Sequence, residues 1–447
     1  MSWKITVIGG GSVLWMPRLA CDMFMEPSLD GSELVLVDID PAAAKLVQEY
    51  LQACVQQLKR SWKISIADED SGLKDADCVV VSISTGGFEA MDKDYTTPEA
   101  FGVYHAVSDT TGPGGIFRTL RNAPVFLDIA RKMAKLCPDA WMLHVTNPLS
   151  QLTRIVNASG LVRCCGLCHE VAGHLNHLRN FFNITDPNGL DATVMGVNHF
   201  TLFTELFAPG IPDAMERITL ANYLKSIPQE DSAGTVDDLV VKGDYKTHPL
   251  YFNIYLKEIL GVYPAAGQVH IAENFPRFFN DPKLIDEYKL YRKGVLPNRP
   301  ENKRKLAERL RATLDEKAVP RETAARSREM LCDAVVGLLA GEPRRIIATL
   351  PNQGQIGNLP RDVSVETWAV ASTKGIDPVF AGDIPMSCYG FMASVVAEQE
   401  LTCAAAVQKD RDLVRQAIFA SPLLHQKERA TELTNAMFEA EKEYLDW

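Results

Sequence analysis

The 447-residue sequence has no run of apolar residues long enough to cross a lipid bilayer, for which about 18 are needed. It also lacks a basic N-terminal segment followed by an apolar stretch and a small-residue cleavage site, because strand-like sequence starts at Trp3. These absences predict a cytoplasmic protein with no membrane partner.

An excess of positive charge is missing as well. The chain carries 46 Lys and Arg against 57 Asp and Glu, a net charge of −11. Nucleic acids and anionic membranes are both bound through clustered Lys and Arg, so we expect neither partner. Apart from Cys164, Cys165 and Cys168, the ten cysteines are scattered, and in a cytoplasmic protein they are expected to stay reduced.

The first 170 residues alternate between short apolar runs and helix-like segments. Asp40 and Pro41 supply the N-cap and first residue of a predicted helix over 41–58. A second helix is predicted over 121–136, where apolar residues recur on one face. This alternation predicts an α/β fold with a Rossmann-type, doubly wound parallel sheet. The predicted strands are Ile5–Ile8, Leu34–Val37, Trp62–Ile66, Cys78–Ile83, Trp141–Val145 and Cys164–Leu167.

Beyond about residue 195 the alternation ends. We therefore predict two domains, 1–195 and 196–447, the second a mixed α+β lobe. Helices of this lobe docking against another copy would form a homodimer or homotetramer. Within it we expect loops and short helices over 209–250, helices over 301–341 and 390–445, and strands at Arg344–Leu350 and Val363–Ser372.

A glycine cluster follows the first strand, in the run Gly9-Gly10-Gly11-Ser12. Glycines here permit a tight turn and let backbone N–H groups approach a pyrophosphate, so Gly9, Gly11 and Ser12 are candidate NAD-binding residues. Asp38 ends the second strand, where an acid can hydrogen-bond a ribose hydroxyl. Leu14 stands where the full motif has a third glycine, and an ordinary strand-to-helix turn would have the same pattern.

Cys168-His169-Glu170 follows the sixth predicted strand, and His199 lies in a second turn-like segment. A thiolate and an imidazole can share a divalent transition metal and leave positions open for substrate oxygens. A buried structural cysteine is the simpler interpretation of Cys168. His174 and His177 fit one helix face with this segment and offer a local metal site instead.

Two further segments suggest ligand contacts. Thr111-Gly112-Pro113-Gly114-Gly115 is interpreted as a flexible loop that can close over a cofactor, which makes Gly112 and Gly114 candidate cofactor-binding residues. Asn147 precedes Pro148 at the end of the fifth strand, where its side chain can face a ligand, although Asn-Pro is also a common turn pair.

Together these pieces resemble glycoside hydrolase family 4. No single piece is decisive, but their order along the chain is specific. The pieces are Gly9–Ser12, Val37–Asp40, Gly112–Gly115 with Arg118 and Arg121, Thr146–Pro148, Cys168–Val171, Gly196–His199, Asn352–Pro360 and Val365-Glu366.

The resemblance implies a fold similar to lactate and malate dehydrogenases, with NAD and a divalent metal, commonly Mn²⁺, as cofactors. It implies a redox-neutral glycosidase, an exception to the scheme with two carboxylates. C3 of the sugar is oxidised, the C2 proton is removed, the aglycone is eliminated, water adds, and C3 is reduced again. Carried over by motif, Cys168 and His199 hold the metal, and Asn147, Arg118 and His270 contact the substrate. His270 and Glu273 match a His-x-x-Glu pattern of the family, and both can instead be supporting or structural residues.

The acid and base are the least defined roles. For the C2 base the chain offers Asp244, Tyr245, His248 and Tyr251, of which Tyr245 is preferred because tyrosine is a family solution. A tyrosine base needs its pKa, about 10 when free, lowered by the metal or a cation. His169 and Asp109 are equal candidates for the acid.

The residues after Cys168 resemble family members that act on α-glucosides without a phosphate. Residues 209–300 depart from that pattern, which suggests either an α-glucosidase-like enzyme or one acting on a glucoside with an anionic group at C6. Lys242, Lys246, Arg277 and Arg292 are candidates to contact such an anion.

Two other functions fit parts of the sequence. An NAD-dependent dehydrogenase of a 2-hydroxy acid would need a His–Asp pair and a carboxylate-binding Arg but no metal. A non-catalytic NAD-binding regulator would need the glycine turn alone.

Overall fold

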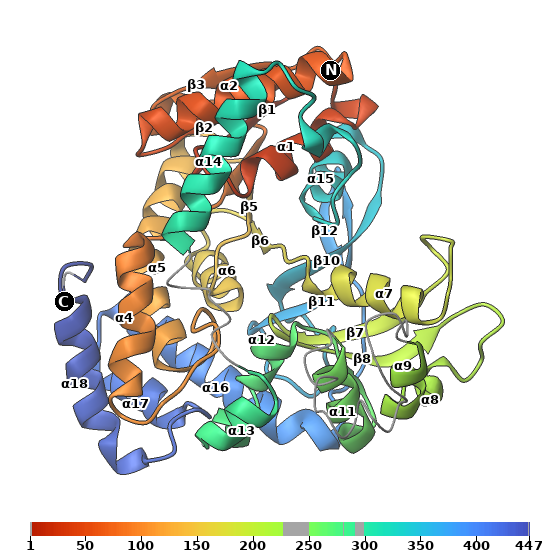
Figure 1. The fold of residues 1–447 in the computed structure, drawn as a ribbon. Helices are drawn as coiled ribbons and strands as arrows, with labels where there is room; N and C mark the ends of the chain where they lie inside the picture. The colour runs from red at the N-terminus through yellow and green to blue at the C-terminus, as the bar shows by residue number, and fades with distance from the viewer. Residues whose placement is uncertain (1, 227–249, 280, 291–298, 446) are drawn as a thin grey trace.

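The computed structural model describes residues 2–226, 250–279, 281–290, 299–445 and 447. A nine-stranded sheet forms its centre (Figure 1). Its strands are β1 (Lys4–Ile8), β2 (Glu33–Val37), β3 (Lys63–Ile66), β4 (Cys78–Val81), β5 (Trp141–His144), β6 (Cys164–Gly166), β10 (Arg344–Pro351), β11 (Ser364–Ser372) and β12 (Gly375–Pro378). They lie in the order β12-β11-β10-β6-β5-β4-β1-β2-β3.

The six strands β1–β6 pair in parallel, and each of them corresponds to one of the six predicted strands. Their order, β3-β2-β1-β4-β5-β6, is typical of dinucleotide-binding folds. The predicted fold class is therefore confirmed. The antiparallel strands β10–β12 extend this sheet beyond β6, through the pair Thr349 and Gly166. The main sheet thus contains strands from both sides of residue 195, and the division of the chain into two domains there stays a prediction.

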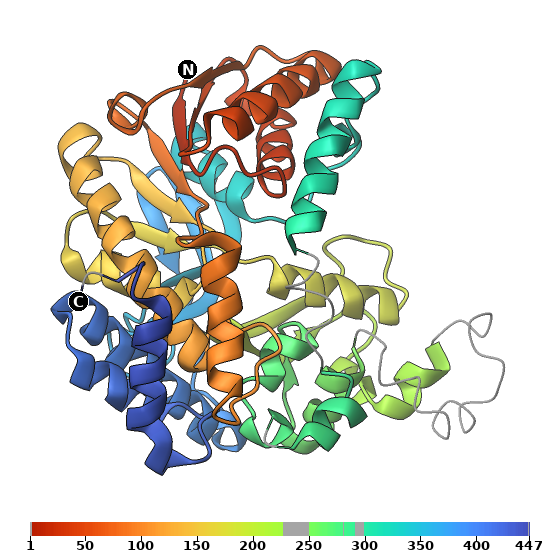
Figure 2. The same cartoon turned by 60° about the vertical axis from the view of Figure 1, so that its left-hand side comes forward.

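Helices cover both faces of the sheet (Figure 2). Alternating side chains of one strand enter different cores, as Val79 and Val80 of β4 do. The core of Val80 includes residues of α1 (Met16–Phe24), α2 (Pro41–Leu58), α14 (Arg299–Asp315) and α15 (Leu331–Val335). The core of Val79 includes residues of α3 (Glu69–Leu73), α5 (Gly112–Leu136), α6 (Leu149–Ser159), α16 (Met386–Gln408), α17 (Arg411–Ala420) and α18 (Ala430–Glu441), while α4 (Gly87–Glu99) packs against α5 and α18.

A second, antiparallel sheet forms the other lobe. It contains β7 (Asp191–Val197), β8 (Phe200–Phe207) and β9 (Tyr263–Pro264) in that order. Ile347 of β10 belongs to its core, and Trp368 of β11 donates from Nε1 to the carbonyl of Ala192 over 2.9 Å. The predicted mixed lobe is confirmed, and it is attached directly to the main sheet. Its helices are α7 (Glu170–Phe181), α8 (Ala214–Arg217), α9 (Leu220–Ser226), α11 (Tyr251–Leu260), α12 (Gln268–Ala272) and α13 (Pro282–Glu287).

Short helical turns complete the described chain. They are η1 (Pro27–Leu29), η4 (Pro276–Phe279), η5 (Arg321–Thr323), η7 (Lys427–Arg429) and the π-helical turn η6 (Val336–Ala340). None of the described helices has the length and apolarity needed to span a membrane.

The predicted helix starts were right in one case and wrong in another. Asp40 caps α2 by accepting from the N–H groups of Ala42 and Ala43. Residues 111–115 do not form a flexible loop, because α5 begins at Gly112 and its first turn is buried. A Cβ on Gly114 would lie 1.9 Å from Oγ of Ser108, so this glycine lets the helix pack closely on the preceding loop.

Candidate active site

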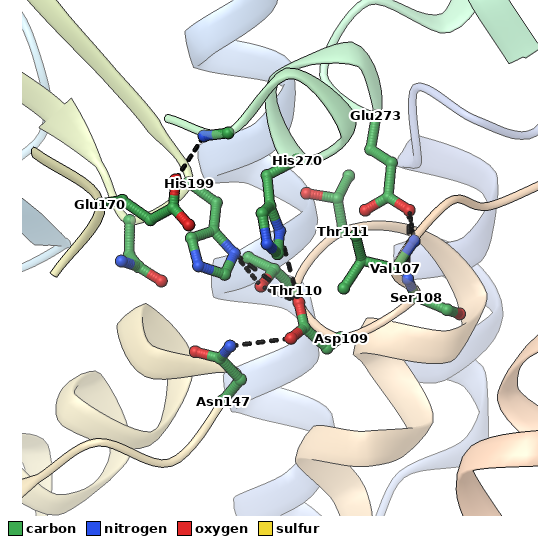
Figure 3. A network of polar contacts seen from close by, with 12 residues as sticks. Val107, Ser108, Asp109, Thr110, Thr111, Asn147, Glu170, His199, His270 and Glu273 are labelled. Carbon is green, nitrogen blue, oxygen red and sulfur yellow. Dashed lines mark hydrogen bonds and ion pairs between the residues drawn. The ribbon is translucent and has the colours of Figure 1, made fainter. Parts of the chain in front are cut away.

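The carboxyl ends of β5 and β6 lead to Asn147 and Cys168, at the edge where doubly wound sheets bind ligands. Three other segments contribute side chains here (Figure 3). Asp109 lies between α4 and α5, His199 in the β7–β8 turn, and His270 on α12.

Asp109, His199 and His270 form a group of candidate metal ligands. One donor atom from each lies within 4.8 Å of the others. His199 Nδ1 is 3.6 Å from Asp109 Oδ1, and His270 Nδ1 is 3.9 Å from the same oxygen. One carboxylate and two imidazoles are ligands that divalent transition metals accept. Nδ1 of His270 is buried and makes no hydrogen bond among the described residues, so the site contains a nitrogen whose lone pair or proton is not used by a hydrogen bond.

Thr110 indicates the tautomer of His199. Its hydroxyl donates to Asp109 Oδ1 over 2.9 Å, and it lies 2.8 Å from His199 Nδ1. In the tautomer compatible with donation from Thr110 to Asp109, His199 donates from Nδ1 to the Thr110 oxygen. Its Nε2 then carries the lone pair that a metal requires.

The charges of this group also suit a cation. Burial lowers the pKa of His199 to about 4, so the ring is neutral at pH 7. Burial alone would raise the pKa of Asp109. The nearby His199, His270 and Arg118 lower it by more than burial raises it, so the pKa lies well below its usual range. At neutral pH the carboxylate is therefore ionised and the His199 imidazole is uncharged.

Cys168 lies beside this group but does not belong to it. It is partly exposed, and the side chain of Asn198 hydrogen-bonds to it. Burial and the carboxylates of Glu366 and Glu170 raise the pKa of the thiol well above its usual value. Of the two predicted metal ligands, only His199 lies in the group of three, and Cys168 as a ligand stays a prediction.

The three predicted substrate-binding residues lie together. Asn147 donates from Nδ2 to Asp109 Oδ2 over 2.8 Å, and Arg118 donates from Nε to the carbonyl of Asn147 over 3.2 Å. The side chain of His270 faces Asp109 from the opposite lobe. Nη1 of Arg118 is buried and has no hydrogen-bond partner among the described residues.

A cavity of about 890 Å³ opens beside the group. His169, at the N-cap of α7, is one of its wall residues, and its side chain is 43% exposed. Its Nδ1 lies 3.5 Å from Glu329 Oε1. Other lining residues come from the starts of α7 and α12 and from 321–329. Of the two acid candidates, His169 is accessible from the cavity, whereas Asp109 is buried and ionised.

The preferred base lies outside the described residues. Tyr245 falls between 226 and 250, as do Asp244, His248, Lys242 and Lys246, and Arg292 falls between 290 and 299. Of the other candidates, Tyr251 is buried at the start of α11, and Arg277 is exposed on η4.

The glycine turn, the predicted cradle for NAD, is tightly packed. Gly9 has φ +90°, and a Cβ there would lie 2.0 Å from the carbonyl oxygen of Ser82. Gly9 and Gly10 donate to the carbonyl of Val37 over 2.9 and 3.0 Å. The Gly11 N–H donates to Asp38 Oδ2 over 2.7 Å. Side chains are thus excluded from the turn, which fits the close approach of a pyrophosphate.

The neighbouring residues refine the predictions for the cofactor. Asp38 already accepts from two backbone N–H groups, Gly11 and Asp40, although a carboxylate has room for a further donor. Leu14, in place of the third glycine, is 54% exposed and leaves the turn intact. Gly112 and Gly114 pack against His105 and Ser108, so close packing alone accounts for both glycines. Their role in cofactor binding stays a prediction.

Sequence reasoning singled out Asp109 and His270 without grouping them with His199. They are separated by 90 and 71 residues from His199, and no spacing rule joins them. The buried neighbours Asn274 and Glu366 were not recognised as parts of the site. A His-x-x-Glu-Asn run was the one available signal for Asn274.

Comparison with known protein families gives two matches that together span most of the chain. Residues 4–184 match the model of the family 4 glycosyl hydrolases, and residues 194–424 match the model of the C-terminal domain of that family.

Two characterised relatives are similar over nearly the whole sequence. An α-galacturonidase of Thermoanaerobacter italicus is 31% identical, over 99% of this chain and 97% of the relative. An α-galactosidase of Bacillus subtilis is 30% identical, over 94% of this chain and 93% of the relative.

Solved structures show the same fold. The LplD protein of Bacillus subtilis has a TM-score of 0.84 and 27% identity, over 98% of this chain and 99% of that one. The 6-phospho-β-glucosidase of Thermotoga maritima, solved with manganese, NAD⁺ and glucose-6-phosphate, has a TM-score of 0.77 and 21% identity, over 99% of both chains.

Proposed function

Because the chain belongs to family 4 of the glycosyl hydrolases, we propose that it is an NAD- and divalent-metal-dependent α-glycosidase whose sugar carries a carboxylate at C6. A galacturonide is the substrate class that fits best. The carrying observation is the group Asp109, His199 and His270, which lies against buried Arg118.

The residues present fit the two groups that the proposal requires. His199 and Asp109 would offer a neutral imidazole and an ionised carboxylate. His270 would offer a nitrogen that makes no hydrogen bond among the described residues, and Cys168 a sulfur beside them. The Gly9–Gly11 turn, which admits no side chain, would hold the pyrophosphate of NAD. When bound, NAD and the metal supply hydride transfer at C3 and polarisation of the C2 and C3 oxygens, with no net change in NAD.

The protein's own side chains position the sugar. Asn147 bonds to Asp109 through Nδ2 over 2.8 Å, and its Oδ1 would contact the sugar. Arg118, on α5, bonds to the main-chain carbonyl of Asn147 and keeps its positive charge at every physiological pH. His169 stands at the cavity wall, where it can donate a proton to the departing aglycone oxygen. Tyr245 remains our proposed base for the C2 proton.

Two observations support an anionic sugar. The relative that is 31% identical over 99% of this chain is an α-galacturonidase. Arg118 carries a buried nitrogen with no protein partner among the described residues, and a carboxylate would satisfy it. This proposal replaces the unmodified α-glucoside that the sequence around Cys168 suggested. The cytoplasmic location and the homodimer or homotetramer remain predictions.

A matched substrate panel tests the proposal. The protein is incubated with NAD, Mn²⁺ and a thiol reductant, and offered the nitrophenyl α-glycosides of galacturonic acid, galactose and glucose. We expect nitrophenol release to be fastest from the galacturonide, with no accumulation of NADH. Fastest release from a neutral sugar would overturn the anionic class alone. NADH rising in proportion to product, or no release from any sugar, would overturn the glycosidase mechanism.

A further inference from the structure

The three candidate metal ligands come from three chain segments that are far apart in the sequence. Asp109 lies in the loop before α5, His199 in the β7–β8 turn, and His270 on α12. A metal centre built in this way depends on whatever holds the segments at fixed separations. Two adjacent buried residues, Glu273 and Asn274, contact all three segments.

Asn274 connects the two histidines. Its Nδ2 donates to the main-chain carbonyl of His199 over 3.1 Å and to that of His270 over 3.0 Å. Its Oδ1 accepts from the hydroxyl of Thr111 over 3.3 Å, which fixes the orientation of the amide. His199 has φ +64°, an uncommon backbone conformation for a residue with a side chain, so an external restraint on its carbonyl is useful.

Glu273 connects α12 to the loop that carries Asp109 (Figure 3). Its Oε1 accepts from three consecutive N–H groups, those of Ala106, Val107 and Ser108, over 2.8, 2.7 and 3.1 Å. Ser108 has φ +55°, so this loop also contains a residue in the left-handed region, directly before Asp109. Glu273 is only 2% exposed, and the loop that it contacts shields it from water.

We propose that Glu273 and Asn274 are positioning residues of the metal centre, which set the separation of Asp109, His199 and His270 without touching the metal themselves. This inference rests on the proposed metal-dependent function. Loss of such supporting contacts typically weakens metal affinity about 10- to 100-fold.

The test measures Mn²⁺ affinity of the full-length protein, from the electron paramagnetic resonance signal of free Mn²⁺, in parallel with NAD affinity and Tm. Asn274→Ala should weaken Mn²⁺ binding about 10-fold or more and leave NAD affinity unchanged. Glu273→Ala should do the same, whereas Glu273→Gln keeps an acceptor oxygen and should recover most of the affinity.

Asn253→Ala is the matched control. Asn253 is equally buried and donates from Nδ2 to two main-chain carbonyls, those of Pro264 and Ala266, over 2.8 and 2.7 Å. It should lower Tm as Asn274→Ala does and leave Mn²⁺ affinity unchanged. Equal Mn²⁺ affinity in Asn274→Ala and wild type, or an equal loss in Asn253→Ala, would overturn the inference. If Asn274→Ala does not fold, the Glu273→Ala and Glu273→Gln pair decides. A wild-type protein that binds no Mn²⁺ would overturn the proposed function instead.

Discussion

Asn147 donates its side-chain amide to Asp109 over 2.8 Å and so joins the end of β5 to the loop that precedes α5. This bond fixes one oxygen of the carboxylate, while Thr110 binds the other over 2.9 Å. The Asp109 carboxylate is therefore oriented before any ligand arrives.

Removal of this orienting bond should impair catalysis more than folding. Asn147→Ala leaves Asp109 Oδ2 without its donor and also removes a proposed sugar contact. We expect kcat/KM to fall about 10- to 100-fold, the range for residues that orient metal ligands. Steady-state kinetics with a matched Tm measurement checks this. Activity within two-fold of wild type would show that the bond is dispensable.

Arg118 should discriminate between charged and neutral sugars. Arg118→Gln removes the positive charge but retains a polar side chain. We expect KM for the α-galacturonide to rise about 10-fold or more, while KM for the α-galactoside changes much less. Arg131→Gln, at an exposed arginine of the same helix, is the control and should affect neither substrate. An equal rise in KM for both sugars would contradict a contact with the carboxylate.

The glycine turn can be tested with two positions that share a backbone conformation. Gly9 has φ +90° and no room for a Cβ, whereas Gly31 has φ +85° and nothing within 4 Å. Gly31→Ala should cost about 1 kcal/mol of unfolding free energy and leave NAD binding unchanged. Gly9→Ala should cost more and weaken NAD binding, as measured by fluorescence titration. Unaltered NAD affinity in Gly9→Ala would disprove the cradle.

Acid stability should depend on a buried histidine at the end of β5. Burial lowers the pKa of His144 to about 3, below the 6.5 of the free side chain. The unfolded chain therefore binds the proton more tightly, so the stabilisation is complete above about pH 6.5 and is lost as the pH falls toward 3.

His144→Gln, which can still bond to Thr153, should flatten the dependence of unfolding free energy on pH in this window. The slope should decrease by up to about 1.4 kcal/mol per pH unit. Urea unfolding at several pH values measures it. His425→Gln, at an exposed histidine, should change the slope less, and an equal change would show that burial is not the cause.

The sequence predicted those features that depend on local patterns. Alternation of apolar runs gave the six parallel strands, and Asp40 with Pro41 gave the start of α2. The segment Thr111–Gly115, with its three glycines, was misread as a flexible loop because flexibility and close packing leave the same sequence pattern. Only the folded chain shows that Gly114 packs on Ser108.

The site could be predicted as a set of residues but not as an arrangement. Asn147, Arg118 and His270 were selected and do lie around Asp109. Asp109 was selected as an acid, yet Arg118 and the hydrogen bonds from Asn147 and Thr110 keep it ionised and make it a better ligand. This distinction depends on burial and on a charge and hydrogen bonds from separate segments, which no spacing in the sequence encodes.

The most direct test of the account follows a single hydrogen of the substrate. An α-galacturonide labelled with deuterium at C2 is hydrolysed in ordinary water with NAD and Mn²⁺, and the released sugar is examined by mass spectrometry. Removal and return of the C2 proton predicts loss of the deuterium to solvent with no net NADH. Retention of the label in hydrolysed product would contradict the elimination step, and with it the proposed mechanism.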